Sequence, residues 1–314
     1  MTNFADRLLL EIKHKNNPTV LGLDPKLSYV PEFLVNEVAA EIDNPLDIAG
    51  EALYRFNVAL IDEVADIMPA VKLQLAYYEM YGIPGLRAFR RTCSYANEQG
   101  LTVIADGKRN DIGSTAAAYA NAYLGSTELT DDLTTSLYTI DALTVNGYLG
   151  FDGIEPFLNV MTTGGKGCFI LVRTSNPSAK DFQDLVLENG DKLYEAVADK
   201  VNTWGELFVG ELGYSSVGAV VGATWPEQAA ELRQRMPRTL ILVPGYGAQG
   251  ATGADVAVNF DENGMGAIVN ASRSLMCAWQ REENCDPEDF AGACRRAAEA
   301  MQKDLLTAIE ARIG

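Results

Sequence analysis

Eight short runs of apolar, largely β-branched residues recur along the chain, and each leads through polar or glycine-rich residues into a helical stretch. In order, these runs are 19–24, 69–74, 101–106, 141–146, 168–173, 217–222, 240–245 and 266–272. Their near-continuous apolar character is typical of parallel strands buried on both faces. The stretches between them, such as 52–67 and 226–236, carry apolar residues at the three- and four-residue spacing of amphipathic helices. This alternation predicts a (β/α)8 barrel, with a doubly wound open sheet as the alternative.

The organisation of the chain predicts one barrel domain over residues 1–314. No linker rich in glycine, serine or proline divides the sequence, and its composition does not shift along its length. Two connections, 25–50 and 174–216, are longer than a barrel needs, so we expect extra helices in both. The N-terminal segment combines alternating charges with a helical apolar period, which indicates a helix rather than a signal peptide.

Composition narrows the classes of partner. A formal net charge of −18 disfavours nucleic acid and anionic membrane surfaces. No run approaches the ~18 uninterrupted apolar residues of a membrane span. The five cysteines are scattered without a CxxC pair, which is typical of reduced thiols and predicts a cytoplasmic location. An anionic small substrate is still compatible, because a few converging lysines and arginines can reverse the field inside a pocket.

Polar and charged residues follow the eight runs. In a (β/α)8 barrel the functional residues lie at the C-terminal ends of the strands, and a barrel needs no such residues there for stability. This end of the barrel is therefore the predicted site. In chain order, the residues are Asp24, Lys72, Asp106 with Lys108, Asn146, Arg173 with Ser175, Thr224, Gln249 and Arg273.

The sharpest signal is the segment DGKRNDIGST, residues 106–115, directly after the third run. Residues two apart on a strand face the same side, so Asp106 and Lys108 are expected to point together into the barrel mouth. Lys72, at the end of the neighbouring strand, can then reach Asp106, and Asp111 follows closely. We expect an alternating Lys–Asp–Lys–Asp array of low solvent access. The alternatives are structural: Asp111 or Ser114 caps the next helix, and Asp106 and Lys108 form a plain ion pair.

A second signal lies at the last two strands, where phosphate sites of such barrels usually form. Residues 244–250, PGYGAQG, make a glycine-rich turn that includes Gly247 and Gln249. Backbone N–H groups of such a turn can approach an anion closely. Arg273, at the end of the next strand, offers a bidentate fork to phosphate. The pair predicts a phosphorylated ligand.

Two further strand ends fit a nucleotide. Ser175 and Asn176 can donate to and accept from the amide edge of a heterocycle, although an Asn–Pro turn explains them equally well. Asp24 can accept hydrogen bonds from sugar hydroxyls, or it is a turn residue before Pro25.

Together these segments resemble the orotidine 5′-phosphate decarboxylase family, in its longer bacterial and mycobacterial-like subgroup. Residues 106–115 match the pattern DxKxxDIxxT completely. The other matching segments are spread in order from the first strand to the eighth. They are GLDP (22–25), VKLQ (71–74), RTSNP (173–177), PGYGAQG (244–250) and SR (272–273).

The resemblance implies a phosphate-binding barrel of the ribulose-phosphate-binding type that converts orotidine 5′-phosphate to UMP in de novo pyrimidine biosynthesis, with no cofactor and no metal. It implies that Lys108 protonates C6 of the pyrimidine, that Asp106 lies beside the departing carboxylate, and that Lys72 contacts Asp106 and the ribose. It also implies a homodimer with a composite active site. The remaining implied contacts are Asp111 and Thr115 to the ribose of the neighbouring subunit's substrate, Asp24 to the ribose, Ser175 to the pyrimidine, Gln249 between base and phosphate, and Gly247 with Arg273 at the phosphate.

Two other functions share some of these features. A magnesium-dependent hexulose-phosphate synthase or related sugar-phosphate lyase also carries a DxK on its third strand, where Asp106 would bind the metal. A non-catalytic phosphosugar-binding barrel would keep the fold without turnover. The complete DxKxxDIxxT motif, with Gln249 and Ser175, favours the decarboxylase.

Overall fold

Eight parallel strands form one closed barrel in the computed structural model, which describes residues 3–247 and 250–314. The order around the barrel is β1, β10, β9, β8, β7, β6, β3 and β2. Each strand coincides with one of the eight apolar runs, so the (β/α)8 prediction is confirmed and the open-sheet alternative is wrong. The strands are β1 (Thr19–Leu23), β2 (Ala70–Gln74), β3 (Thr102–Arg109), β6 (Ala142–Val145), β7 (Gly167–Arg173), β8 (Ser215–Val221), β9 (Thr239–Pro244) and β10 (Ala267–Ala271).

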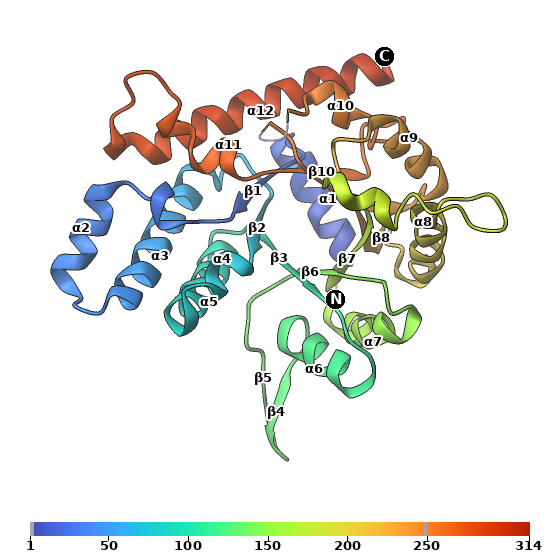
Figure 1. The fold of residues 1–314 in the computed structure, drawn as a ribbon, viewed down its shortest axis with the longest axis horizontal. Coiled ribbons are helices and arrows are strands. Elements are labelled where there is room, and N and C mark those ends of the chain that lie inside the picture. Colours follow the sequence, from blue (N-terminus) through green and yellow to red (C-terminus); the bar gives the residue numbers. More distant parts are fainter. Residues whose placement is uncertain (1–2, 248–249) are drawn as a thin grey trace.

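Helices surround the barrel, as Figure 1 shows. The longest, α12 (Phe290–Ile313), packs against α3 (Pro45–Val64) and against α10 (Gly253–Ala257). The other helices on the outside are α5 (Gly82–Glu98), α6 (Gly113–Tyr123), α7 (Glu155–Gly164), α8 (Leu193–Trp204) and α9 (Pro226–Arg235), with the short α4 (Ala76–Glu79) and α11 (Arg273–Met276) at strand ends.

The N-terminal helix α1 (Phe4–Lys15) is present as predicted and packs against the inside of the barrel. Its residues Phe4, Leu8 and Leu9 share a buried cluster with inward-facing strand residues. The Phe4 and Phe169 rings meet edge to face, with centroids 6.0 Å apart. Asn3 caps the helix by accepting hydrogen bonds from the first helical N–H groups. This end of the barrel is therefore filled, and the opposite end is left for a ligand.

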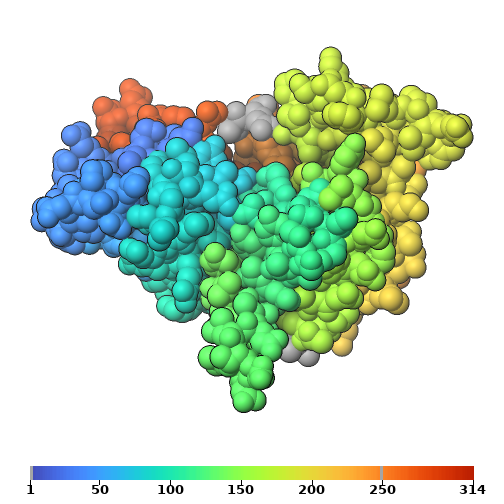
Figure 2. Space-filling model, turned by 60° about the horizontal axis from the view of Figure 1, so that its bottom comes forward, coloured from blue at the N-terminus to red at the C-terminus, as the bar shows by residue number. Residues whose placement is uncertain are grey.

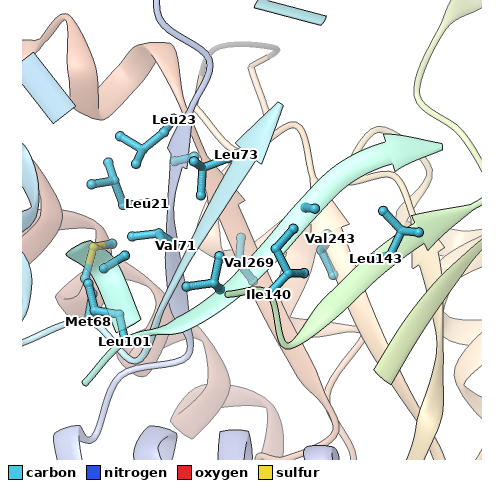
Figure 3. Close-up of a cluster of buried hydrophobic side chains, with 14 of the residues drawn as sticks. Leu21, Leu23, Met68, Val71, Leu73, Leu101, Ile140, Leu143, Val243 and Val269 are labelled. Atoms are coloured by element: carbon cyan, nitrogen blue, oxygen red, sulfur yellow. The ribbon is translucent and has the colours of Figure 1, made fainter. Parts of the chain in front are cut away.

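Each strand has two buried faces, which explains the near-continuous apolar runs. Val71 and Leu73 of β2 point outward into the cluster between barrel and helices, close to Leu21 and Leu23 of β1 (Figure 3). Side chains alternate along a strand, so Lys72 between them points inward. The packing of the outer layer thus fixes which residues face the barrel interior.

Three connections add structure beyond the minimal barrel. The segment 25–50 contains η1 (Leu27–Tyr29), α2 (Glu32–Glu41) and the start of α3, and 174–216 contains η3 (Pro177–Asp181), α8 and η4 (Glu206–Phe208). The third is a hairpin of β4 (Thr127–Thr130) and β5 (Leu133–Thr135), a separate two-stranded sheet that projects from the molecule (Figure 2). No sequence pattern predicts this hairpin, because its mostly exposed residues contain no apolar run. Among the described residues, no helix has the length and apolar character needed to cross a membrane.

Candidate active site

A cavity of about 800 Å³ opens at the C-terminal end of the barrel. Six of the eight strand ends contribute polar side chains to its lining, while β8 contributes Val220 and β9 contributes Leu242 and Pro244. The predicted location of the site is therefore a real concavity. Its polar lining includes Asp24, Lys72, Gln74, Asp106, Lys108, Thr144, Ser175, Asn270, Ser272 and Arg273.

Four charged side chains form a continuous array on one side of this cavity. The Lys72 Nζ lies 2.9 Å from Asp106 Oδ2 and 3.7 Å from Asp24 Oδ1. The Lys108 Nζ lies 2.6 Å from Asp106 Oδ1. The order is thus Asp24–Lys72–Asp106–Lys108, with both predicted contacts to Asp106 present. The prediction that Asp111 joins this array is wrong within one chain: the second carboxylate is Asp24, which lies at the Lys72 end of the array and not beside Lys108.

Solvent access differs along the array. The side chains of Lys72 and Asp106 are 3% and 11% exposed, whereas the Lys108 side chain is 45% exposed. The expectation of low solvent access is therefore right for the inner pair and wrong for Lys108. A lysine at the open side of a cavity, held by a buried carboxylate, can meet a ligand and also exchange protons with water.

The charges of the inner pair support one another. Burial alone would raise the pKa of the Asp106 carboxyl, but the Lys72 and Lys108 ammonium groups outweigh burial and hold that pKa well below its usual range. Burial alone would lower the pKa of Lys72, but the carboxylates of Asp106 and Asp24 raise it above its ordinary value. At neutral pH the inner pair is therefore an ionised carboxylate beside a charged ammonium group.

Two uncharged residues that the sequence analysis missed complete the environment of Asp106. Gln74 Nε2 donates to Asp106 Oδ2 at 2.9 Å, and the Thr144 hydroxyl donates to Asp106 Oδ1 at 2.8 Å. With the two lysines, each carboxylate oxygen receives two donors. The sequence could have predicted both residues. Gln74 lies two residues after Lys72 on the same strand and so faces the same side, and Thr144 is the one hydroxyl residue in the strand ALTV.

The opposite wall of the cavity is suited to an anion. Gly245, Ser272 and Arg273 line it at the ends of β9 and β10. Gly22 of β1 allows the close approach of β10, because a Cβ there would lie only 2.0 Å from the Ser272 Oγ. The cavity thus combines a charged array on one side with an arginine on the other.

A family model described as the orotidine 5′-phosphate decarboxylase / HUMPS family matches residues 34–286. The chain belongs to this family.

Full-length relatives and a solved structure agree with this membership. The chain is 41% identical over 310 residues to an orotidine 5′-phosphate decarboxylase of Caldicellulosiruptor saccharolyticus, covering 98% of this chain and 100% of the relative. It is 43% identical to the one of Rhodopirellula baltica, covering 97% and 99%. The structure of Leishmania donovani OMP decarboxylase superposes with a TM-score of 0.72 at 27% identity, covering 98% of this chain and 99% of that one.

Two residues of the decarboxylase-like motif lie outside the chain's own cavity. Asp111 and Thr115 do not line it, and Thr115 is exposed. The Asp111 Oδ1 accepts the N–H of its neighbour Ile112, and helix α6 begins at Gly113 without a side-chain cap. The alternative that Asp111 or Ser114 caps this helix is therefore wrong.

The remaining residues of the motif differ in their placement. Ser175 lines the cavity and lies against Gly222, where a Cβ would be 2.9 Å from the Ser175 Cβ. Gly247 lies outside the cavity lining, with φ at +70° and its N–H donating to the Ala251 carbonyl at 2.9 Å. Gln249 falls outside the described residues. Within the described part of the chain, no three His, Cys, Asp or Glu side chains are grouped to hold a metal ion.

Proposed function

We propose that this chain decarboxylates orotidine 5′-phosphate to UMP with its own side chains and no cofactor, as a step of pyrimidine biosynthesis. The observation that carries the proposal is the Asp24–Lys72–Asp106–Lys108 array on the cavity wall of a member of this family. The named relatives, which match the chain over nearly its full length, support the same reaction.

The array fits the electronic demand of this reaction. When the bond between C6 and the carboxylate breaks, CO2 leaves and the electron pair stays on C6, with no adjacent carbonyl to delocalise it. The Lys108 ammonium supplies the positive charge and transfers a proton to C6. The amine left behind regains its proton from water, which its 45% exposure allows. Asp106 lies beside the departing carboxylate, and its low pKa keeps it charged there.

The rest of the substrate has matching partners in the proposal. Arg273 clamps the phosphate, with Gln249 and Gly247 assigned to the same end of the ligand. Lys72 and Asp24 contact the ribose, and Ser175 contacts the pyrimidine. Because the phosphate is held far from the reacting carbon, its binding energy can hold the substrate against the array.

A homodimer with a composite site is part of the proposal. It is supported by Asp111 and Thr115, which do not line their own cavity, and by the exposed apolar side chains beside them. Ile112 is 52% exposed and Phe151 is 44% exposed, and η2 (Phe151–Gly153) packs close to the Asp111 backbone. A second copy of the chain would cover this surface and bring its own Asp111 and Thr115 to the first copy's ribose. All five cysteines are free, which supports a cytoplasmic location.

The reaction is tested by the ultraviolet change of orotidine 5′-phosphate on mixing with purified protein in the presence of a chelator. Conversion to UMP is expected at a rate the chelator does not change. No conversion, together with Mg²⁺-dependent activity on sugar phosphates, would assign the barrel to a hexulose-phosphate synthase-like reaction. Nucleotide binding without turnover would indicate the non-catalytic alternative.

The composite site is tested by mixing two inactive variants, Lys108→Ala and Asp111→Ala. A mixed dimer has one site with a native Lys108 and the partner's native Asp111. Random reassociation of equal amounts should therefore restore about a quarter of wild-type activity. No recovery after subunit exchange would contradict the composite site.

A further inference from the structure

The segment of β3 that carries Asp106 and Lys108 is irregular, and one residue of β6 lies opposite the irregularity. Ala105 pairs with Leu143 and Arg109 pairs with Val145. Three residues of β3 thus lie between these pairs, against Thr144 alone on β6. The bulge turns Lys108 back towards Asp106, because Lys108 has a left-handed backbone with φ at +47°. Such a conformation is rare for residues other than glycine and needs support from its surroundings.

The hydroxyl of Thr144 provides contacts to both ends of this bulge. It accepts the backbone N–H of Lys108 at 3.0 Å and donates to Asp106 Oδ1 at 2.8 Å. One hydroxyl can do both, since it has one donor and two acceptor positions. Thr144 is 1% exposed, so in the folded protein both contacts are shielded from bulk water.

We propose that Thr144 is a positioning residue, whose hydroxyl holds the left-handed turn at Lys108 and thereby fixes the Lys108 ammonium against Asp106. This inference rests on the proposed function. The Lys108 side chain is partly exposed and its stem is flexible, so the backbone turn sets where its ammonium lies. Without the hydroxyl, Lys108 can relax to a negative φ and carry its ammonium away from Asp106.

The test compares Thr144→Val, which replaces the hydroxyl by a methyl group of similar size, with Thr144→Ser, which keeps the hydroxyl. Thr144→Val should lower kcat by about a hundredfold while KM changes by less than about threefold, because the phosphate contacts are untouched. Thr144→Ser should stay within about fivefold of the wild-type kcat. Thr144→Ala removes the hydroxyl without adding a methyl group, and decides the question if Thr144→Val does not fold.

The matched control is Thr19→Val at the filled end of the barrel. Thr19 is also fully buried on a barrel strand, and its hydroxyl donates to Asn17 Oδ1 at 2.6 Å. This variant should lower the melting temperature and leave kcat unchanged. A wild-type kcat in Thr144→Val, equal losses in Thr144→Ser and Thr144→Val, or a kcat loss in Thr19→Val as large as in Thr144→Val would overturn the proposal.

A second readout needs no substrate. Hydrogen–deuterium exchange of the peptide around Lys108 should speed up in Thr144→Val and Thr144→Ala, but not in Thr144→Ser or Thr19→Val. Unchanged exchange in the first two would remove the role of Thr144. If the wild-type protein does not convert orotidine 5′-phosphate, the proposed function fails, and the exchange experiment still decides whether the hydroxyl holds the turn.

Discussion

Two buried cations lie at strand ends of this barrel, Lys72 on β2 and Arg173 on β7, and only the first of them lines the cavity. Lys72 faces the cavity and is held by carboxylates that also line it. Arg173 is fully buried and does not line the cavity. Its guanidinium lies between the rings of Tyr194 and Trp225, at 5.0 and 4.6 Å from their centroids.

The partners of Arg173 show what it does instead. Its Nε donates to Gln228 Oε1 at 2.7 Å, and its terminal nitrogens reach Gln183 and Asp184. Gln183 in turn accepts the N–H of Thr174, next to Ser175. Arg173 thus ties the segment after β7 to α8 and α9, whereas the array around Lys72 keeps its charges at a cavity surface. The lesson is that a charged residue at a strand end predicts function only through its neighbours.

The largest effect on turnover is expected when the charged array loses Lys108. Lys108→Ala should lower kcat by about ten-thousandfold, since it removes both the proton donor and the charge that stabilises C6. The free energy of unfolding should change by less than about 1 kcal/mol, because the side chain is partly exposed. Steady-state kinetics and thermal unfolding measure the two quantities, with Lys200→Ala on α8 as the control. Near-normal turnover by Lys108→Ala would remove its assigned role.

For Arg173 we expect a large loss of stability and a small loss of kcat. Arg173→Met should lower the free energy of unfolding by about 2–4 kcal/mol, because the side chains that accept its hydrogen bonds lose their donor and the ring contacts are lost. Its kcat should stay within about tenfold of wild type. KM should rise, because the segment after β7 that carries Ser175 into the cavity lining is less firmly held. Arg233→Met, at another buried arginine bonded to backbone carbonyls, should cost comparable stability without raising KM. A kcat loss in Arg173→Met as large as in Lys108→Ala would contradict the separation of a catalytic role for the array from a structural role for Arg173.

Another strand-end cation, Arg273, lies on the exposed rim of the cavity and is assigned to the phosphate. Arg273→Ala should raise KM by about 10- to 100-fold with little change in stability, the effect of losing charged hydrogen bonds to phosphate. Arg312→Ala, at the exposed end of α12, is the matched control. An unchanged KM would place the phosphate elsewhere.

The sequence predicted the barrel well because its signal is local: eight apolar runs mark the eight strands, and their alternation sets which side chains face inward. The contact of Lys72 with Asp106 follows from the same logic. The contact of Lys108 with Asp106 is also present, but simple alternation was the wrong reason. It depends on a bulge and a left-handed Lys108, which come from pairing with β6 far along the chain. Asp111 lies outside the cavity lining, and Asp24 joins the array from the neighbouring strand β1, a contact that the strand order permits but no local pattern marks.

The smallest expected effect tests how Asp106 is held. Its folded-state pKa lies below the ordinary 3.8, so its ionised form adds stability that is present above pH 4 and lost as pH falls through the lower folded value. The wild-type protein should therefore lose about 1 kcal/mol more than Asp106→Asn between pH 5 and pH 3, where the unfolded carboxyl takes up its proton and the folded one does not. Denaturant unfolding at both pH values measures this difference. A wild-type advantage that grows as pH falls would mean that burial, and not the two lysines, sets the pKa of this carboxyl, and would remove the contrast between an array whose lysines keep a buried carboxylate charged and an arginine that holds α8 and α9 to the segment after β7.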